Sequence, residues 1–320
     1  MPLSPAPFYE EDAEGPPGHV AHWVRAADGV RLRVGAWPAQ GTARGTVLLF
    51  PGRTEYIEKY GRTAAEFAGR GLGTLVIDWR GQGLADRLLD EPGPGHVGQF
   101  LDYQHDVRAA VQAARQLNLP KPWYLLAHSM GGAIGLRALI EGLPVEAAAF
   151  TGPMWGIRIG ALMRPAAWAL SWGSSVVGLG HRIAPGTGEA SYVATAAFED
   201  NTLTTDADMF RYMQEQVRRR PELQLAGPSL QWLREALAEC LALSRLPAPR
   251  LPCSVFVGGL ERIVDLPRIE ERMRAWPGGR LEQLQGAEHE LLMERPEIRG
   301  RVLDRITAQF LDCATTREPA

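Results

Sequence analysis

The chain has 320 residues, of which 45% are hydrophobic and 22% charged, and its formal net charge is −3 at pH 7. This composition is that of a globular protein with enough apolar side chains for a sizeable core. A small negative charge provides no basic surface, so nucleic acid is excluded as the expected partner. The three cysteines, Cys240, Cys253 and Cys313, form no C-x-x-C pair, which argues against a disulfide framework or a zinc site and favours a reducing compartment.

The first residues, 1–19, are rich in proline and acidic side chains and show no basic-then-apolar leader pattern. We expect an extended N-terminal arm there. No apolar stretch is long enough for a transmembrane helix, because the nearest candidate, 165–180, is short and interrupted by Ser and Gly. We therefore expect a cytoplasmic protein and leave open a peripheral contact with the inner membrane.

Strand and helix patterns alternate along the first half of the chain. Residues 20–37 predict two strands joined by a turn at Asp28-Gly29. Buried strands are predicted next at 46–50, 73–77, 123–127 and 145–150, with helices at 60–70, 102–117 and 130–141. This alternation indicates a mostly parallel sheet with helices on both faces.

The alternation breaks at residues 152–249, which contain apolar and aromatic residues and charged helical stretches but no core-strand pattern. We predict a helical lid inserted over the carboxyl edge of the sheet. Its charges nearly balance, so docking on a membrane by basic charge alone is not expected. The core is then formed by 20–151 and 250–312, with strands at 254–257 and 280–284 and a closing helix at 296–311, followed by a C-terminal tail at 313–320.

The most informative motif surrounds Ser129, which lies between the strand ending at Ala127 and the helix beginning at Met130. A serine in a strand–turn–helix is typical of a nucleophile elbow, and the small residues Ala127 and Gly131 suit its tight turn. The helix N-terminus would favour a negative charge developing beside the serine. The alternative is that Ser129 only caps the helix.

Two glycine-containing turns follow earlier strands. Where a nucleophile elbow is present, the first of them, Pro51-Gly52-Arg53, supplies the second backbone N–H of the oxyanion hole. We assign that donor to Arg53 and pair it with the N–H of Met130; an ordinary turn is the alternative. The second turn, at 78–83, lacks a phosphate-binding pattern, and we interpret Asp78 and Arg80 as organisers of the loop.

A serine nucleophile needs a base, and the base needs an acid, in the chain order serine, acid, histidine. Of the seven histidines, only His289 follows the last predicted strand, and we assign it as the base. Glu261 and Asp265 both follow the strand at 254–257 and both remain candidates for the acid. Glu261 is favoured, because Asp265 suits the N-cap of the next helix.

With these residues placed, the chain resembles the α/β-hydrolase superfamily, in particular its monoglyceride lipases and bacterial lysophospholipases. The resemblance extends from about residue 20 to 311 and rests on P-G-R-T-E-Y at 51–56, D-W-R-G-Q-G at 78–83, H-S-M-G-G at 128–132, G-P-M-W-G-I at 152–157, E-R-I-V-D at 261–265 and G-A-E-H-E at 286–290. It implies an α/β-hydrolase fold with a mostly parallel, eight-stranded sheet. Glu261 stands where the monoglyceride lipases carry an aspartate, a departure that keeps Asp265 under consideration.

The expected function is a serine hydrolase that cleaves carboxylic esters of a small lipid-like substrate, a lysophospholipid or monoacylglycerol, through an acyl-enzyme on Ser129. It needs no metal ion or organic cofactor. Met154, Trp155 and Ile157 are candidates for substrate contacts. The alternatives are a general carboxylesterase, thioesterase or peptidase with the same triad, and a non-catalytic binding protein of the same fold.

Overall fold

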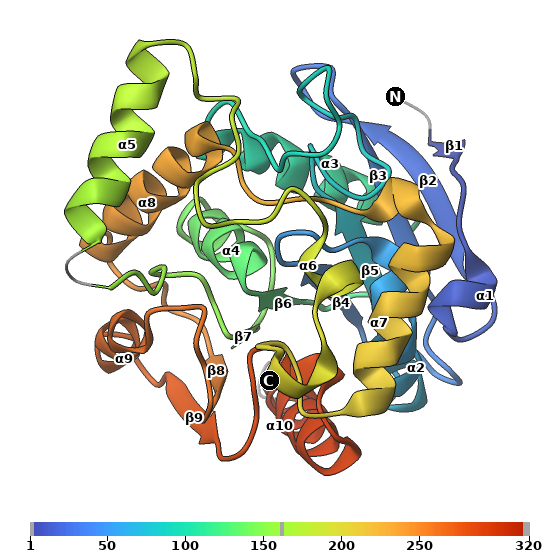
Figure 1. Ribbon diagram of the computed structural model, residues 1–320. Helices are drawn as coiled ribbons and strands as arrows, with labels where there is room; N and C mark the ends of the chain where they lie inside the picture. Colours follow the sequence, from blue (N-terminus) through green and yellow to red (C-terminus); the bar gives the residue numbers. More distant parts are fainter. Residues whose placement is uncertain (1–2, 161–162, 316–320) are drawn as a thin grey trace.

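The computed structural model describes residues 3–160 and 163–315. A nine-stranded sheet of order β1-β2-β3-β5-β4-β6-β7-β8-β9 runs through its centre (Figure 1). The strands are β1 (Ser4–Pro5), β2 (Val20–Arg25), β3 (Arg31–Trp37), β4 (Thr46–Phe50), β5 (Gly73–Asp78), β6 (Trp123–His128), β7 (Ala148–Thr151), β8 (Cys253–Gly258) and β9 (Arg280–Leu284). Pairing is antiparallel from β1 to β5 and parallel from there to β9, which confirms the mostly parallel sheet.

The predicted number of eight strands was wrong by one. Ser4 and Pro5, in the stretch expected to be an extended arm, pair with Trp23 and His22 of β2. A strand at the edge of a sheet exposes unpaired N–H and C=O groups, and the first residues of the chain cover part of that edge. A short helix, α1 (Glu10–Ala13), follows in the same stretch.

Helices cover both faces of the sheet, and alternate strand residues point to opposite faces. One face packs Leu48, Leu125 and Val255 with α3, α4, α8 and α9, and the other packs Leu49 and Phe256 with α2, α7 and α10. The helices of the two core segments are α2 (Gly61–Gly69), α3 (Tyr103–Gln116), α4 (Met130–Ile140), α9 (Leu266–Arg274) and α10 (Pro296–Thr315). Helix α10 thus extends past residue 312, and positions 316–320 of the expected tail lie outside the described residues.

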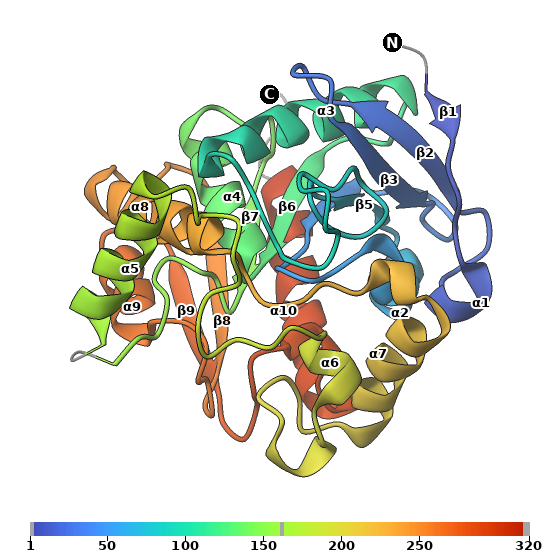
Figure 2. The same ribbon diagram turned by 45° about the horizontal axis from the view of Figure 1, so that its top comes forward.

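Between β7 and β8 the chain forms mainly helices and turns (Figure 2). Helix α5 packs against α8, α6 packs against α7, and α8 also contacts α4 of the core. These helices are α5 (Arg164–Val176), α6 (Tyr192–Thr195), α7 (Ala207–Arg219) and α8 (Leu230–Arg245). Within the described part of the chain, every helix is too short or too polar to cross a membrane.

Buried ion pairs hold the loops at the carboxyl edge of the sheet. Arg33 donates from Nε to Asp78 (2.7 Å) and through its other two nitrogens to Glu58 (2.7 Å each). Arg80 is bonded to Asp106, at 2.7 Å from Nη2 to Oδ1. These pairs lie away from solvent, where losing one partner would strand a charge. The interpretation of Asp78 and Arg80 as organisers of the loop is therefore confirmed.

Candidate active site

Ser129 lies between β6 and α4 in a backbone conformation that few side chains adopt. Its φ is 49° and its ψ is −118°, and it is among the non-glycine residues with a positive φ. Such strain persists only where the surrounding structure imposes it, and it is common at functional sites. At Gly131 a Cβ atom would lie 2.1 Å from the carbonyl oxygen of Phe50, so the turn needs its small residue. The tight turn expected around Ser129 is present.

His289 is bonded to Glu261. Its Nδ1 lies 2.7 Å from Oε2 of the carboxylate, and both side chains are buried. Burial alone would raise the pKa of Glu261, but His289 and the backbone N–H groups of Ile263 and Val264 lower it below its ordinary value. The carboxylate is therefore ionised and accepts the proton of Nδ1. This leaves Nε2 of His289 as the nitrogen that can act as a base.

The two candidate acids occupy different places. Glu261 reaches His289 directly, whereas Asp265 lies at the N-cap position of α9. The structure thus brings Glu261 to the histidine and leaves Asp265 at the start of the helix. Gly152, at the end of β7, also makes room for the ring, because a Cβ there would lie 2.9 Å from Nδ1 of His289.

Ser129 and His289 open on one cavity of about 700 Å³. Among the described residues no hydrogen bond joins them, and catalytic pairs are often looser before substrate binds. Arg53 and Met130, whose backbone N–H groups are the expected oxyanion donors, line the same cavity. Most of the remaining wall is apolar and comes from the segment between β7 and β8, including Met163, Leu170, Met213, Val217, Leu225 and Leu233.

Only some of the residues expected to contact the substrate lie at the cavity. Met154 and Ile157 line the cavity, but Trp155 does not, so that prediction was wrong for the tryptophan. Its indole N–H donates to the carbonyl of Gly132 at 3.0 Å, and its ring stacks on Trp276 with centroids 6.2 Å apart. The large ring fills the core between α4 and α9 instead of facing the site.

The side chain of Arg53 was missed by the sequence reasoning, which used only its backbone. It lines the cavity, donates from Nη1 to the carbonyl of Ala226 at 2.8 Å and lies 5.7 Å from the ring centroid of Trp232. None of the described carboxylates forms an ion pair with it. Burial lowers the pKa of Arg53 to about 10, still well above neutral pH, so a cation without a counter-charge faces the cavity.

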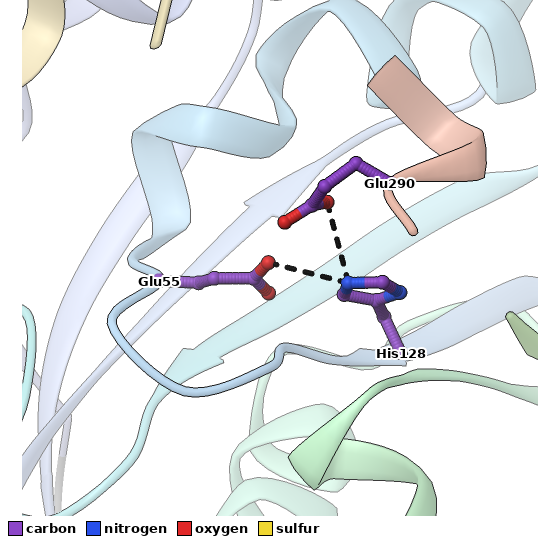
Figure 3. A group of neighbouring side chains, drawn as sticks. All are labelled: Glu55, His128 and Glu290. Atoms are coloured by element: carbon purple, nitrogen blue, oxygen red, sulfur yellow. Dashed lines mark ion pairs between the residues drawn. The ribbon is translucent and has the colours of Figure 1, made fainter. Parts of the chain in front are cut away.

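A buried cluster of charges lies beside the site and was also missed; Figure 3 shows its members Glu55, His128 and Glu290. Lys59 donates to Oε1 of Glu55 (2.5 Å) and to Oε1 of Glu290 (2.7 Å). Nε2 of His128 lies 3.3 Å from Glu290 and 3.6 Å from Glu55. The two glutamates and the histidine have the spacing of a metal site, but the ammonium of Lys59 already provides the cation, so the set does not suit a metal ion.

Sequence comparison identifies the family. The family model described as serine aminopeptidase S33 (Hydrolase_4) matches residues 41–296. Lysophospholipase L2 of Escherichia coli K12 is 33% identical over 296 residues, covering 88% of this chain and 85% of the relative. The chain belongs to this family of α/β-hydrolases. It is therefore a hydrolase, and the probable lysophospholipase L2 of Haemophilus influenzae is a further relative, 28% identical over 83% of the chain and 84% of the relative.

Solved structures agree on the fold of this α/β-hydrolase. A soluble variant of Saccharomyces cerevisiae monoglyceride lipase, in complex with a substrate analog, superposes with a TM-score of 0.70 at 20% identity, covering 90% of this chain and 94% of that one. A thermostable carboxyl esterase from Bacillus coagulans gives a TM-score of 0.71 at 13% identity, with 91% and 97% covered. At these identities the likeness concerns the fold alone.

Proposed function

We propose that this α/β-hydrolase cleaves carboxylic esters of lipid-like substrates, with lysophospholipids and monoacylglycerols as the leading classes. The observation that carries the proposal is the opening of Ser129 and the Glu261-bonded His289 on one largely apolar cavity. A hydroxyl, a base and an acid provide nucleophilic catalysis, and apolar walls accommodate an acyl chain. The lysophospholipase and monoglyceride lipase names of the relatives support the same class.

In the acylation step, Nε2 of His289 takes the proton of Ser129 while Oγ forms a bond to the ester carbonyl carbon. Glu261 stabilises the imidazolium that results. The carbonyl oxygen becomes an oxyanion and accepts hydrogen bonds from the backbone N–H groups of Arg53 and Met130. The carbon–oxygen bond to the alcohol then breaks, and His289 gives its proton to that leaving oxygen.

Deacylation repeats these steps with water as the nucleophile. His289 removes a proton from water as the water oxygen attacks the acyl carbon, and the same two N–H groups hold the new oxyanion. The bond to Ser129 then breaks, and Oγ recovers its proton from His289. The products are a carboxylic acid and the original enzyme.

The uncompensated charge of Arg53 favours lysophospholipids over monoacylglycerols. A guanidinium can donate several hydrogen bonds to a phosphate, and a phosphodiester would supply the missing negative charge. A glycerol head group would leave this cation without a negative partner. The carboxylates of Glu55 and Glu290 are both bonded to Lys59, so the cavity offers little for the ammonium group of a peptide substrate.

We propose a peripheral contact with a lipid surface through α5 and the residues that flank it. Trp172 is 62% exposed and Val176 is 76% exposed, and Met163 and Leu170, also exposed, line the cavity as well. The apolar surface is thus continuous with the site where an acyl chain would enter. A cytoplasmic location is proposed with it, supported by the buried thiols of Cys240 and Cys253, which form no disulfide.

The experiment that tests the function is labelling with a fluorophosphonate, followed by mass spectrometry of the modified peptide. We expect one label per chain, on Ser129, and none on a folded Ser129→Ala variant, which should also lose ester turnover. Wild-type turnover by Ser129→Ala would refute the mechanism. Folded wild type that neither reacts with the probe nor hydrolyses any ester would favour a non-catalytic binding protein.

A further inference from the structure

The buried cluster beside the site is attached to the oxyanion turn. Glu55 follows that turn, and its Oε2 accepts a hydrogen bond from the backbone N–H of Gly52. The same carboxylate accepts from the hydroxyl of Tyr60 at 2.5 Å and from Lys59 at 2.5 Å. The position of the turn that presents the N–H of Arg53 therefore depends on a carboxylate held by a lysine.

The cluster is also attached to the loops of His289 and Ser129. Glu290 directly follows His289, and its Oε1 is bonded to Lys59 at 2.7 Å. His128 directly precedes Ser129, and its ring lies 4.9 Å from the ring of His289, centroid to centroid. The loops that carry the N–H of Arg53, Ser129 and His289 thus each contribute a charged or ionisable group to one buried cluster, whereas the loop of Glu261 does not.

The contacts of His128 define its protonation state. Its Nδ1 lies 3.0 Å from the carbonyl oxygen of Thr151 and 3.0 Å from the hydroxyl of the same residue. A carbonyl only accepts, so Nδ1 carries a proton. Nε2 makes no hydrogen bond among the described residues, but it lies 3.3 Å from Glu290 and 3.6 Å from Glu55, and a bare nitrogen there would set a lone pair against two anions. Both nitrogens are therefore protonated.

The charges around His128 agree with this assignment. Burial would lower the pKa of His128, but Glu290 and Glu55 raise it above its ordinary value against the opposing charge of Lys59. The ring of His128 also lies beside Gly52, beside Thr151 on β7 and beside His289, and of these three only His289 is ionisable. Two carboxylates are thus balanced by one ammonium and one imidazolium. A balanced set is what a buried position demands, since an unpaired charge there is costly.

We propose that Glu55, Lys59, His128 and Glu290, here called the buried quartet, hold the oxyanion turn, Ser129 and His289 in register, with His128 acting as an imidazolium. They are positioning residues, because they act through the loops to which they belong. The inference rests on the proposed catalytic roles of Ser129 and His289. It adds to them a requirement for zero net charge in the quartet.

The test changes the charge of the quartet and then restores it. Lys59→Met leaves one excess negative charge, Glu290→Gln leaves one excess positive charge, and the double variant is neutral again. Each single variant is expected to lower kcat about 10²-fold, as small displacements of catalytic groups do, with KM changed less than about threefold. The double variant should recover most of the lost kcat.

A matched control is Arg70→Met, which removes an ion pair with Glu66 of the same i,i+4 spacing but outside the quartet. It should leave kcat unchanged. Single variants with wild-type kcat, or a double variant no faster than the slower single variant, would overturn the proposal. Wild type that does not react with the fluorophosphonate would instead refute the proposed function.

A second measurement does not depend on the variants folding well. Protein labelled with ¹⁵N only in histidine would be examined by NMR at pH 7, and the signals of His128 assigned by their loss in His128→Gln. Both ring nitrogens of His128 are expected at the shifts of protonated nitrogens. A signal of an unprotonated nitrogen for His128 at that pH would overturn the imidazolium.

Discussion

At Ser129 a strained backbone coincides with the proposed nucleophile. A side chain at φ 49°, ψ −118° is strained, whereas glycine adopts a positive φ readily. Ser129→Gly should therefore raise the free energy of unfolding by about 1 kcal/mol while abolishing turnover. Ser129→Ala keeps the Cβ and should abolish turnover without that gain. Denaturant unfolding of the two variants makes the comparison, and equal stabilities would contradict the strain.

The acid is tested by Glu261→Gln and Asp265→Asn. An amide at Glu261 can donate to Nδ1 of His289 and favour the wrong tautomer, so kcat is expected to fall about 10³–10⁴-fold. Asp265→Asn should keep kcat within a few-fold of wild type, since Asp265 lies at the start of α9. Steady-state kinetics on one ester decide between them. A larger loss for the asparagine variant would assign the acid to Asp265.

Arg53 is tested by the choice of substrate. Arg53→Met keeps the backbone N–H but removes the cation that would pair with a phosphate. We expect kcat/KM for a lysophospholipid to fall about 10- to 100-fold, as for the loss of a charged hydrogen bond, and kcat/KM for the monoacylglycerol of the same chain length to change little. Arg53→Lys should lie between. Equal losses on both substrates would contradict the head-group role.

At the scale of elements, α5 and the residues that flank it line the cavity and also expose apolar side chains to solvent. Replacing Trp172 with Gln should weaken binding to neutral phosphatidylcholine vesicles about tenfold, since burial of a large apolar side chain contributes at least about 1.5 kcal/mol. Hydrolysis of a short, water-soluble ester should be unchanged. Leu281→Gln, at an exposed leucine on β9, is the control. Vesicle sedimentation measures binding, and equal effects of the two substitutions would contradict a contact through α5.

At the scale of the whole molecule, the quartet makes stability depend on pH. The pKa of His128 is raised in the folded state, so its contribution to stability is complete below the unfolded pKa, about 6.5, and is lost as pH rises through the folded value. The difference in unfolding free energy between wild type and His128→Gln should therefore shrink from pH 6 to pH 9. Guanidinium unfolding at several pH values measures it. A difference independent of pH would contradict a charged His128.

Local sequence patterns were enough to predict most of the strands and helices and the mostly parallel sheet. Buried strands such as β4 and β6 are short apolar runs, and their alternation with helices predicts a parallel sheet because parallel strands need crossovers. The turn around Ser129 and the place of His289 after the last strand follow from chain order in the same way. These features depend on neighbours a few residues away, which the amino-acid sequence contains.

Contacts between residues far apart in the sequence determined the features that local patterns could not predict. Glu261 and Asp265 follow the same strand, and only the folded loop shows which carboxylate reaches His289, 28 residues from Glu261 along the chain. Ser4 and Pro5 were predicted to lie in an extended arm. They form a strand only because they pair with β2, and the sequence around them does not reveal that partner. Trp155 lies outside the cavity because its ring packs against Trp276 in the core.

The buried quartet was the feature hardest to predict from the sequence. Lys59 and Glu290 are 231 residues apart, and charged residues in loops ordinarily face water. They become a buried pair only because parallel strands bring their loops to one edge of the sheet, where each charge finds its opposite. Local apolar periodicity encodes the elements, but the balance of buried charge exists only once distant loops meet.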